Sequence, residues 1–272
     1  MGKDTMNKID FQIILHAEAM THPGLCRSTN QDALGFFPED GCFFVADGMG
    51  GGSAGDIASS LLENELSEAI EISGNETHEE LEKSIRNAIG AAHQKIRSYA
   101  DARTFEQMGT TLALMLFDPW NPHSAKLCHV GDSRIYRFRD QSLKVLTRDH
   151  TVGAELEQDM PDRWKNNSMG DHRNSYYSHI LTRVIGSKHD CEPEWTETDI
   201  RPQDRYLICS DGVTTMLSET EIQNAMSSMD QPEEVVRALS DSVLQAGAKD
   251  NFSIIIVFVR EFEFESQNTK SE

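Results

Sequence analysis

The sequence predicts an α+β protein, a four-layer α/β/β/α sandwich in which two antiparallel sheets stack and helices cover their outer faces. Two observations predict this architecture. Strand-like runs and helical stretches come in blocks instead of strict alternation, which argues against a doubly wound parallel sheet. The last apolar run, residues 252–259, is apolar on both faces, so it needs cover on both sides.

The first half of the chain is expected to hold a buried strand and two helices. Residues 43–46 form an apolar run that follows a hairpin turn at 38–41. Helical periodicity then predicts one helix from about 53 to 72 and a second from about 79 to 100. Their inward faces are expected to be Ile57, Leu61, Leu62, Leu66 and Ile70, and Leu81, Ile85, Ala88, Ile89, Ala92 and Ile96.

The second half continues mostly in strands, with one more helix near the end. The apolar spacing of Val235, Val236, Leu239 and Val243 predicts a helix over about 232–245. Strands are expected at 110–117, 125–130, 134–139, 143–146, 205–209 and 252–259, with a polar irregular stretch over about 158–178.

The composition indicates a single globular domain. Hydrophobic residues make up 38% of the 272 residues, which is enough for a core. We expect one domain over residues 8–262 and a disordered polar tail over 263–272. The five cysteines are scattered and never form CxxC, so a reducing compartment without a structural zinc site is expected.

The charge balance excludes two classes of partner. The chain carries 25 Lys and Arg against 45 Asp and Glu, a net charge of −20, which repels nucleic acid and anionic membrane surfaces. It has no 18-residue apolar run, and its first residues, MGKDTMNKID, lack the apolar core of a signal peptide. We therefore expect a cytoplasmic protein with no nucleic-acid or membrane partner.

Four aspartates stand beside apolar runs that we expect to be strands. Asp47 ends the run FFVAD, Asp211 ends YLICSD, Asp132 follows LCHVG, and Asp250 precedes the final strand. One Asp-Gly after a strand is most often a turn, but several carboxylates beside a core need partners. Because neighbouring antiparallel strands begin and end at a shared edge, Asp47, Asp211 and Asp250 can converge there.

Clustered carboxylates of this kind predict a divalent metal site. No Lys or Arg is adjacent to Asp47 or Asp211, so a cation must offset their repulsion. Oxygen ligands suit Mg²⁺ or Mn²⁺ better than zinc, and the ten histidines show no paired ligand spacing. Two such ions are the usual centre for hydrolysis of phosphate esters.

The glycine-rich stretch 48–55 and Arg27 each have both a functional and a plainer interpretation. The glycine-rich stretch 48–55 lies where a phosphate loop would, yet it lacks the Gly-Lys-Ser/Thr ending, so a tight turn that lets a carbonyl reach a metal is favoured over nucleotide binding. Arg27 alone would be an ordinary surface residue. Beside a metal cluster, its guanidinium is the right group to clamp two phosphate oxygens.

Seven short motifs share one order and spacing with a known family. They are RSTNQD, VADGMGG, GTTL, HVGDSR, LTRVIG, CSDG and KDN, which together span roughly residues 20–260. In these motifs the chain resembles the metal-dependent protein phosphatases, the PPM or protein phosphatase 2C family, and DGMGG resembles the bacterial branch.

The resemblance implies a sandwich fold and a phosphatase activity. A member of this family removes phosphate from phosphoserine and phosphothreonine in proteins with Mn²⁺ or Mg²⁺, by direct attack of a water that bridges the two ions. Its partners in signalling would be phosphorylated proteins, including a cognate Ser/Thr kinase or the substrates of that kinase.

The resemblance also implies roles for the metal-binding residues. Asp47 would bridge both ions, with the Gly48 carbonyl on one of them. Asp211 and Asp250 would hold the other ion. Asp132 matches the residue that, together with Asp211, binds a weaker third ion in bacterial members.

Three other segments receive implied roles. Arg27 would grip the substrate phosphate, and Asp32 would hold metal-bound water. The polar stretch 152–178 matches the flap beside the active site, which family members vary to change substrate choice.

Two positions depart from the eukaryotic pattern. Gln31 replaces a Glu, and Met49 stands where many eukaryotic members have a His that is proposed to protonate the leaving group. Because Met cannot donate a proton, a metal-bound water or no discrete acid is expected to serve.

Two alternative functions remain open at this point. A non-catalytic scaffold or sensor of the same fold would have no need of the intact Asp47, Asp211 and Asp250. A phosphatase for a small phosphorylated molecule would be separated from a protein phosphatase by a panel of phosphopeptides.

Overall fold

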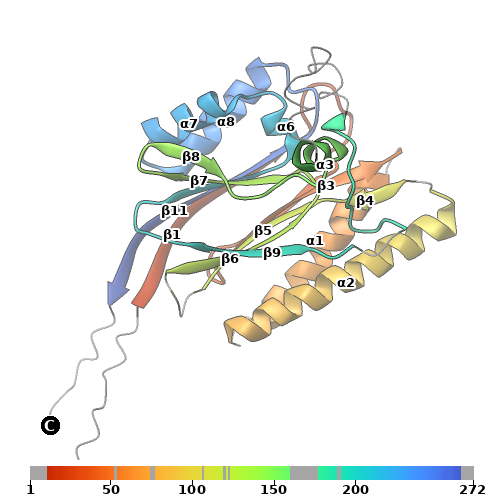
Figure 1. The fold of residues 1–272 in the computed structure, drawn as a ribbon, viewed down its shortest axis with the longest axis horizontal. Helices are drawn as coiled ribbons and strands as arrows, with labels where there is room; N and C mark the ends of the chain where they lie inside the picture. The colour runs from red at the N-terminus through yellow and green to blue at the C-terminus, as the bar shows by residue number, and fades with distance from the viewer. Residues whose placement is uncertain are drawn as a thin grey trace, which may run out of the picture.

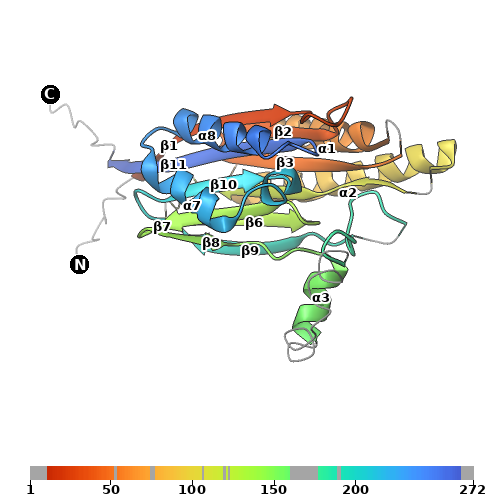
Figure 2. The same ribbon diagram turned by 90° about the horizontal axis from the view of Figure 1, so that it is seen from above.

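Two antiparallel sheets lie face to face in the computed structural model, and helices cover the outer face of each (Figures 1 and 2). The structure describes residues 11–51, 54–73, 77–105, 107–118, 121, 123–159, 177–188 and 191–264. This arrangement confirms the predicted four-layer sandwich.

The first sheet has the strand order β1-β11-β10-β7-β8. Its strands are β1 (Phe11–His22), β7 (Arg134–Arg139), β8 (Ser142–Val145), β10 (Arg205–Cys209) and β11 (Phe252–Phe264). The second sheet has the order β2-β3-β5-β6-β9, with β4 paired to β3. Its strands are β2 (Asp32–Phe37), β3 (Cys42–Gly50), β4 (Met108–Thr110), β5 (Leu112–Phe117), β6 (Ser124–Val130) and β9 (Glu194–Asp199).

The helices are divided between the two outer faces. Those described are α1 (Ala54–Ser73), α2 (His78–Arg103), α3 (Val152–Asp159), α6 (Asp211–Thr214), α7 (Glu219–Ser228) and α8 (Pro232–Gln245). Helices α1 and α2 pack on the second sheet, while α7 and α8 pack on the first, and α3 projects from the body of the sandwich (Figure 2).

Three apolar layers lie between the four layers of helices and sheets. Strand β11 shows how one strand serves two of them. Its Ile254 and Ile256 pack toward α7 and α8, whereas Ile255 and Val257 pack between the sheets against residues such as Phe43. Successive side chains of a strand point to opposite faces, so a strand covered on both sides is apolar throughout.

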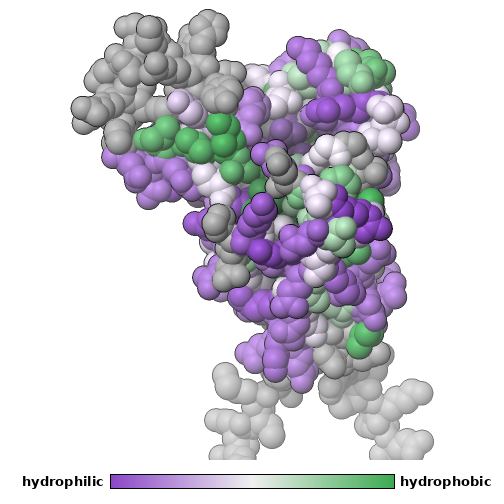
Figure 3. All heavy atoms as spheres, turned by 90° about the vertical axis from the view of Figure 1, so that its right-hand side faces the viewer, coloured by the Kyte–Doolittle hydropathy of each residue, from purple (hydrophilic) through white to green (hydrophobic). Residues whose placement is uncertain are grey.

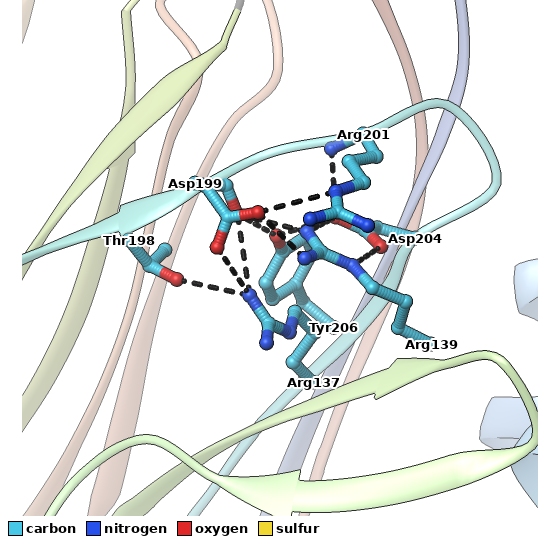
Figure 4. A network of polar contacts seen from close by, with 7 residues as sticks. All are labelled: Arg137, Arg139, Thr198, Asp199, Arg201, Asp204 and Tyr206. Carbon is cyan, nitrogen blue, oxygen red and sulfur yellow. Dashed lines mark hydrogen bonds and ion pairs between the residues drawn. The ribbon is translucent and has the colours of Figure 1, made fainter.

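A network of ion pairs joins the two sheets beside the N-terminal end of β10, which begins at Arg205 (Figure 4). Arg139 of β7 donates two hydrogen bonds of 2.6 Å to the Asp204 carboxylate and one of 2.6 Å to Asp199 at the end of β9. Tyr206 also donates to Asp204, at 3.0 Å. Because Asp199 belongs to one sheet and Arg139 to the other, these contacts link the layers.

Several expected elements have different bounds in the structure. Strand β3 continues past the expected end to Gly50, so Asp47 lies within it, and the expected strand 110–117 is two strands. Strands β1 and β9 and helices α3, α6 and α7 were not predicted.

The termini and the flap are only partly described. Strand β11 runs to Phe264, two residues into the segment expected to be a tail, and the rest of that segment lies outside the described residues. Of the flap, 152–159 form α3, and most of the remainder, 160–176, is also outside them. Within the described part of the chain, no helix has the length and apolarity needed to span a membrane.

Candidate metal centre

A cavity of about 490 Å³ opens at the edge where β10 ends and β11 begins. Asp47, Asp132, Asp211 and Asp250 line it together with Arg27, although the aspartates are as many as 203 positions apart in the sequence. Antiparallel pairing of β10 with β11 produces this convergence, because the C-terminal end of the first lies beside the N-terminal end of the second.

Hydrogen bonds between the backbone of Asp47 and two threonines hold this residue in place. Its amide donates to the hydroxyl oxygen of Thr111 at 2.9 Å, and its carbonyl accepts from the Thr111 amide at 2.9 Å and from the Thr110 hydroxyl at 3.0 Å. The Thr111 hydroxyl is also 2.7 Å from that of Ser133, next to Asp132. The GTTL and GDSR motifs are therefore joined beneath the carboxylates.

Asp32 lies directly opposite Asp47 in the β2–β3 register and is buried. Its Oδ2 accepts hydrogen bonds from the hydroxyls of Ser210 at 2.7 Å and Ser253 at 2.8 Å. Among the described residues its buried Oδ1 has no hydrogen-bond partner. Burial raises the pKa of Asp32 to about 7, and the nearby charges of Asp211 and Asp250 add to the shift while the two serines oppose it.

The carboxyls of Asp47, Asp132 and Asp211 also bind protons more readily than usual. Burial raises the pKa of Asp47 well above its ordinary range, and the charges of Asp32 and Asp211 add to this. Burial likewise raises the pKa of Asp132 to about 7 and raises that of Asp211, whose carboxyl shares a hydrogen bond with Asp47. A cation placed among them would stabilise the charged forms.

These donors fit hard divalent cations. The cavity offers the carboxylates of four aspartates and the backbone of Gly48, and Asp32, paired with Asp47 across β2 and β3, has a buried Oδ1 without a partner among the described residues. Oxygen-only sets of this kind are preferred by Mg²⁺ and Mn²⁺. In the described residues, no three His, Cys, Asp or Glu side chains stand in a closed metal-binding cluster, so the carboxylates are distributed around the cavity.

The glycine after each central aspartate permits close packing of backbone. A Cβ at Gly48 would stand 2.0 Å from the carbonyl oxygen of Gly55, and one at Gly212 would stand 1.9 Å from that of Asn251. Any side chain at these positions would push apart the segments that bring Asp47 and Asp211 together.

Arg27 lies at the cavity with its side chain 53% exposed. Its Nη2 donates to Oδ2 of Asp250 at 2.7 Å. Because the guanidinium is exposed, its remaining N–H groups are accessible to an incoming anion.

Asn251 fixes the loop that carries Arg27. Its Nδ2 donates to the carbonyl oxygens of Pro23 at 2.8 Å and Thr29 at 2.9 Å, and its Oδ1 accepts from the Gln31 amide at 2.9 Å. Asn251 was missed as a functional residue, although it is the last letter of the KDN motif.

His179 was missed as well. It lines the same cavity as Asp211. Of the described residues that line the cavity, His179 alone carries an imidazole. Its position just before the LTRVIG motif was the available signal. Met49 also lines the cavity.

Comparison with known proteins decides the family. The profile of the protein phosphatase 2C family matches residues 27–250. The chain belongs to this family. It is 32% identical over 248 residues to a serine/threonine phosphatase stp of Listeria welshimeri, covering 89% of this chain and 95% of that protein.

Solved structures of family members share the fold. The serine/threonine phosphatase PstP/Ppp of Mycobacterium tuberculosis has a TM-score of 0.75 at 28% identity, covering 92% of this chain and 100% of that chain. A PstP catalytic domain in complex with two manganese ions has a TM-score of 0.76 at 28% identity with the same coverage. The chain is thus a bacterial-type serine/threonine protein phosphatase of the PPM family.

Proposed function

We propose that this chain hydrolyses phosphoserine and phosphothreonine in proteins by direct attack of water at a centre for two divalent cations, Mn²⁺ or Mg²⁺. The observation that carries the proposal is the gathering of Asp47, Asp132, Asp211 and Asp250 around one cavity with Arg27. Bound there, the ions would supply an acidified water and would offset charge on the phosphoryl oxygens.

The chain's residues divide the remaining work. Asp47 and the Gly48 carbonyl, with Asp211 and Asp250, are the residues that would hold the main pair of ions. Asp132 would help Asp211 hold a weaker third. This assignment is supported by the raised pKa of Asp47, Asp132 and Asp211, because ions at this place would offset both the burial and the mutual repulsion of these carboxylates.

Arg27 and Asp32 would act on the substrate and on water. Arg27 would bind the phosphate, since its guanidinium lies exposed at the cavity beside Asp250. Asp32, with two serine hydroxyls on Oδ2 and a buried Oδ1 without a described partner, would orient water behind Asp47.

The partners follow from this reaction. We infer that the substrates are phosphorylated signalling proteins in the cytoplasm, among them a Ser/Thr kinase or its targets. The catalytic domain is proposed to occupy residues 8–262.

Metal removal tests the proposal. The purified protein should release phosphate from phosphothreonine peptides when Mn²⁺ or Mg²⁺ is added, and EDTA should abolish that release. The activity should return when Mn²⁺ is restored. Full activity after exhaustive chelation would show that the two-metal proposal is wrong.

A further inference from the structure

A second cavity of about 260 Å³ adjoins the metal centre. It lies where the C-terminal end of α2 meets β4 and the segment 184–188, and it shares Met49 and Gln107 with the first cavity. The shared residues make the two cavities neighbours, although the second contains none of the aspartates of the metal centre.

The second cavity is lined by both apolar and polar residues. Met49, Phe105, Met108 and Val184 supply apolar surface, and the polar residues are Arg97, Asp101, Gln107, Ser187 and Lys188. The guanidinium of Arg97 is bound to the wall itself, because it donates from Nη1 to the carbonyl oxygens of Ser187, at 3.3 Å, and Lys188. An apolar group that packs against Phe105, Met108 and Val184 would be removed from water there.

The walls are fixed by contacts between distant segments. Thr110 and Ile185 exchange two backbone hydrogen bonds of 3.0 Å, and the Gly186 amide donates to Nδ1 of His93 on α2 at 3.0 Å. Phe105 stacks on Tyr99, with ring centroids 6.5 Å apart, and its amide donates to Ala100. Because these contacts already hold the walls in place, binding of a side chain in the cavity would cost little conformational entropy.

Its size favours a side chain over a separate small molecule. Small-molecule sites usually have volumes of about 300–1,000 Å³. A cavity of about 260 Å³ beside a site that acts on phosphorylated polypeptides is suited to one side chain of the same polypeptide.

We propose that this cavity receives a bulky apolar side chain (Leu, Ile, Met or Phe) of the phosphoprotein substrate, at a position close to the phosphorylated residue. This inference rests on the proposed function. It makes the cavity a determinant of substrate choice formed by α2, β4 and the segment 184–188, outside the flap.

The test compares phosphothreonine peptides that carry Leu or Asn at one position at a time on both sides of the phosphothreonine. At one position, Leu should raise kcat/KM about tenfold over Asn, the discrimination typical of an apolar pocket. Para-nitrophenyl phosphate, which has no flanking residues, measures the metal centre alone.

A variant that fills the cavity should remove the preference. In Ser187→Trp the Leu-to-Asn ratio should fall to about one, while turnover of para-nitrophenyl phosphate stays within about twofold of the unaltered protein. Ser142→Trp, at an exposed serine on β8, is the matched control and should keep the preference. Melting temperatures of both variants verify folding.

The outcomes are distinguishable from failure of the proposed function. No turnover of any phosphopeptide or of para-nitrophenyl phosphate would contradict the phosphatase mechanism. Turnover with equal kcat/KM for Leu and Asn at every position, already in the unaltered protein, would overturn the subsite alone. So would an unchanged preference in folded Ser187→Trp.

Discussion

Asp47 and Asp32 illustrate the energetic problem at the residue scale. They are direct neighbours across an antiparallel pair, where like charges destabilise a sheet. The one Arg–Asp ion pair at the cavity, between Arg27 and Asp250, has side chains 53% and 42% exposed, and such pairs contribute about 0–1 kcal/mol. That is too little to compensate the buried carboxylates, so bound cations are the fitting source of compensation.

The proposed role of Arg27 is tested by Arg27→Ala. Loss of one charged hydrogen bond to phosphate, about 1.5–3 kcal/mol, should lower kcat/KM on a phosphopeptide by roughly 10–150-fold. Because Arg27 is not a proposed metal ligand, Mn²⁺ stoichiometry by calorimetry should not change. Arg27→Lys keeps the charge without the planar fork and should fall between the two. An unchanged kcat/KM would remove Arg27 from phosphate binding.

Asp132 and Asp47 should differ when each is replaced. Asp132→Ala is expected to fold, to bind two Mn²⁺ ions by calorimetry and to lose much of its turnover, because the residue is assigned to the weaker third ion. Asp47→Ala should lose tight metal binding itself, since it removes a carboxylate proposed to hold the main pair of ions.

A capping role is the alternative for Asp132. If it only stabilises the turn before β7, its loss would lower stability by about 1 kcal/mol and leave the chemistry intact. A near-normal kcat with a lowered melting temperature would therefore show that the third-ion assignment is wrong.

We propose that His179, which lines the cavity, donates the proton to the leaving oxygen. General acid catalysis contributes about 10²–10⁴-fold, so His179→Ala should slow phosphothreonine peptides by about 10²-fold. Turnover of para-nitrophenyl phosphate, whose leaving group needs no proton, should change by less than about threefold. His16→Ala, at an exposed histidine of β1, is the control. Equal losses on both substrates would argue against the role.

At the scale of elements, the network around Asp204 should stabilise the fold without taking part in catalysis. The Asp204 side chain is fully buried and accepts from Arg139 and Tyr206, at the opposite end of β10 from Asp211. Breaking a buried ion pair costs about 3–5 kcal/mol, so Asp204→Ala should lower the melting temperature by about 10 °C. Mn²⁺ affinity of the folded protein should not change.

Asp199 provides the matched comparison for Asp204. It joins the same network, but its side chain is 55% exposed, so Asp199→Ala should destabilise by about 1 kcal/mol or less. Equal losses of melting temperature in the two variants would show that burial does not decide the strength of this network.

Helices and strands whose apolar residues recur at regular spacing could be predicted from the sequence. Those that depend mainly on backbone pairing with a neighbouring strand could not. Helix α8 occupies the expected range 232–245 because one face is strongly apolar. Strand β9, EWTETD, has no apolar alternation and exists through its pairing with β6. The extension of β3 to Gly50 likewise depends on its pairing with β4.

The candidate metal centre was likewise only partly predictable from the sequence. Strand-end aspartates were visible in the sequence, because carboxylates beside apolar runs are unusual. The contacts of Asn251 with Pro23 and Thr29 span more than 220 positions, and no local pattern encodes them. His179 reaches the cavity from a segment without apolar periodicity, so its place depended on tertiary structure.

At the scale of the whole molecule, the net charge of −20 and the carboxylate cavity make stability depend on pH and on divalent metal together. Asp32 has a folded-state pKa of about 7 against an ordinary value of 3.8. The folded state therefore holds more protons than the unfolded state between these values, and stability falls as pH rises from about 4 to above 7. Asp132 acts in the same direction.

Melting curves in EDTA and in Mn²⁺ test this linkage. In EDTA the melting temperature should be lower at pH 8 than at pH 6, because more of the buried carboxyls are forced into their charged forms. Mn²⁺ at about 100 times its dissociation constant adds about 2.7 kcal/mol per site, and each kcal/mol raises the melting temperature by about 2–4 °C in a domain of about this size. At one fixed Mn²⁺ concentration the gain should be larger at pH 8 than at pH 6, because charged ligands lower the dissociation constant. Sodium chloride at the same ionic strength screens the general repulsion and serves as the control. If Asp47→Ala gained as much from Mn²⁺ as the unaltered protein, the stabilising ions would bind outside the carboxylate cavity.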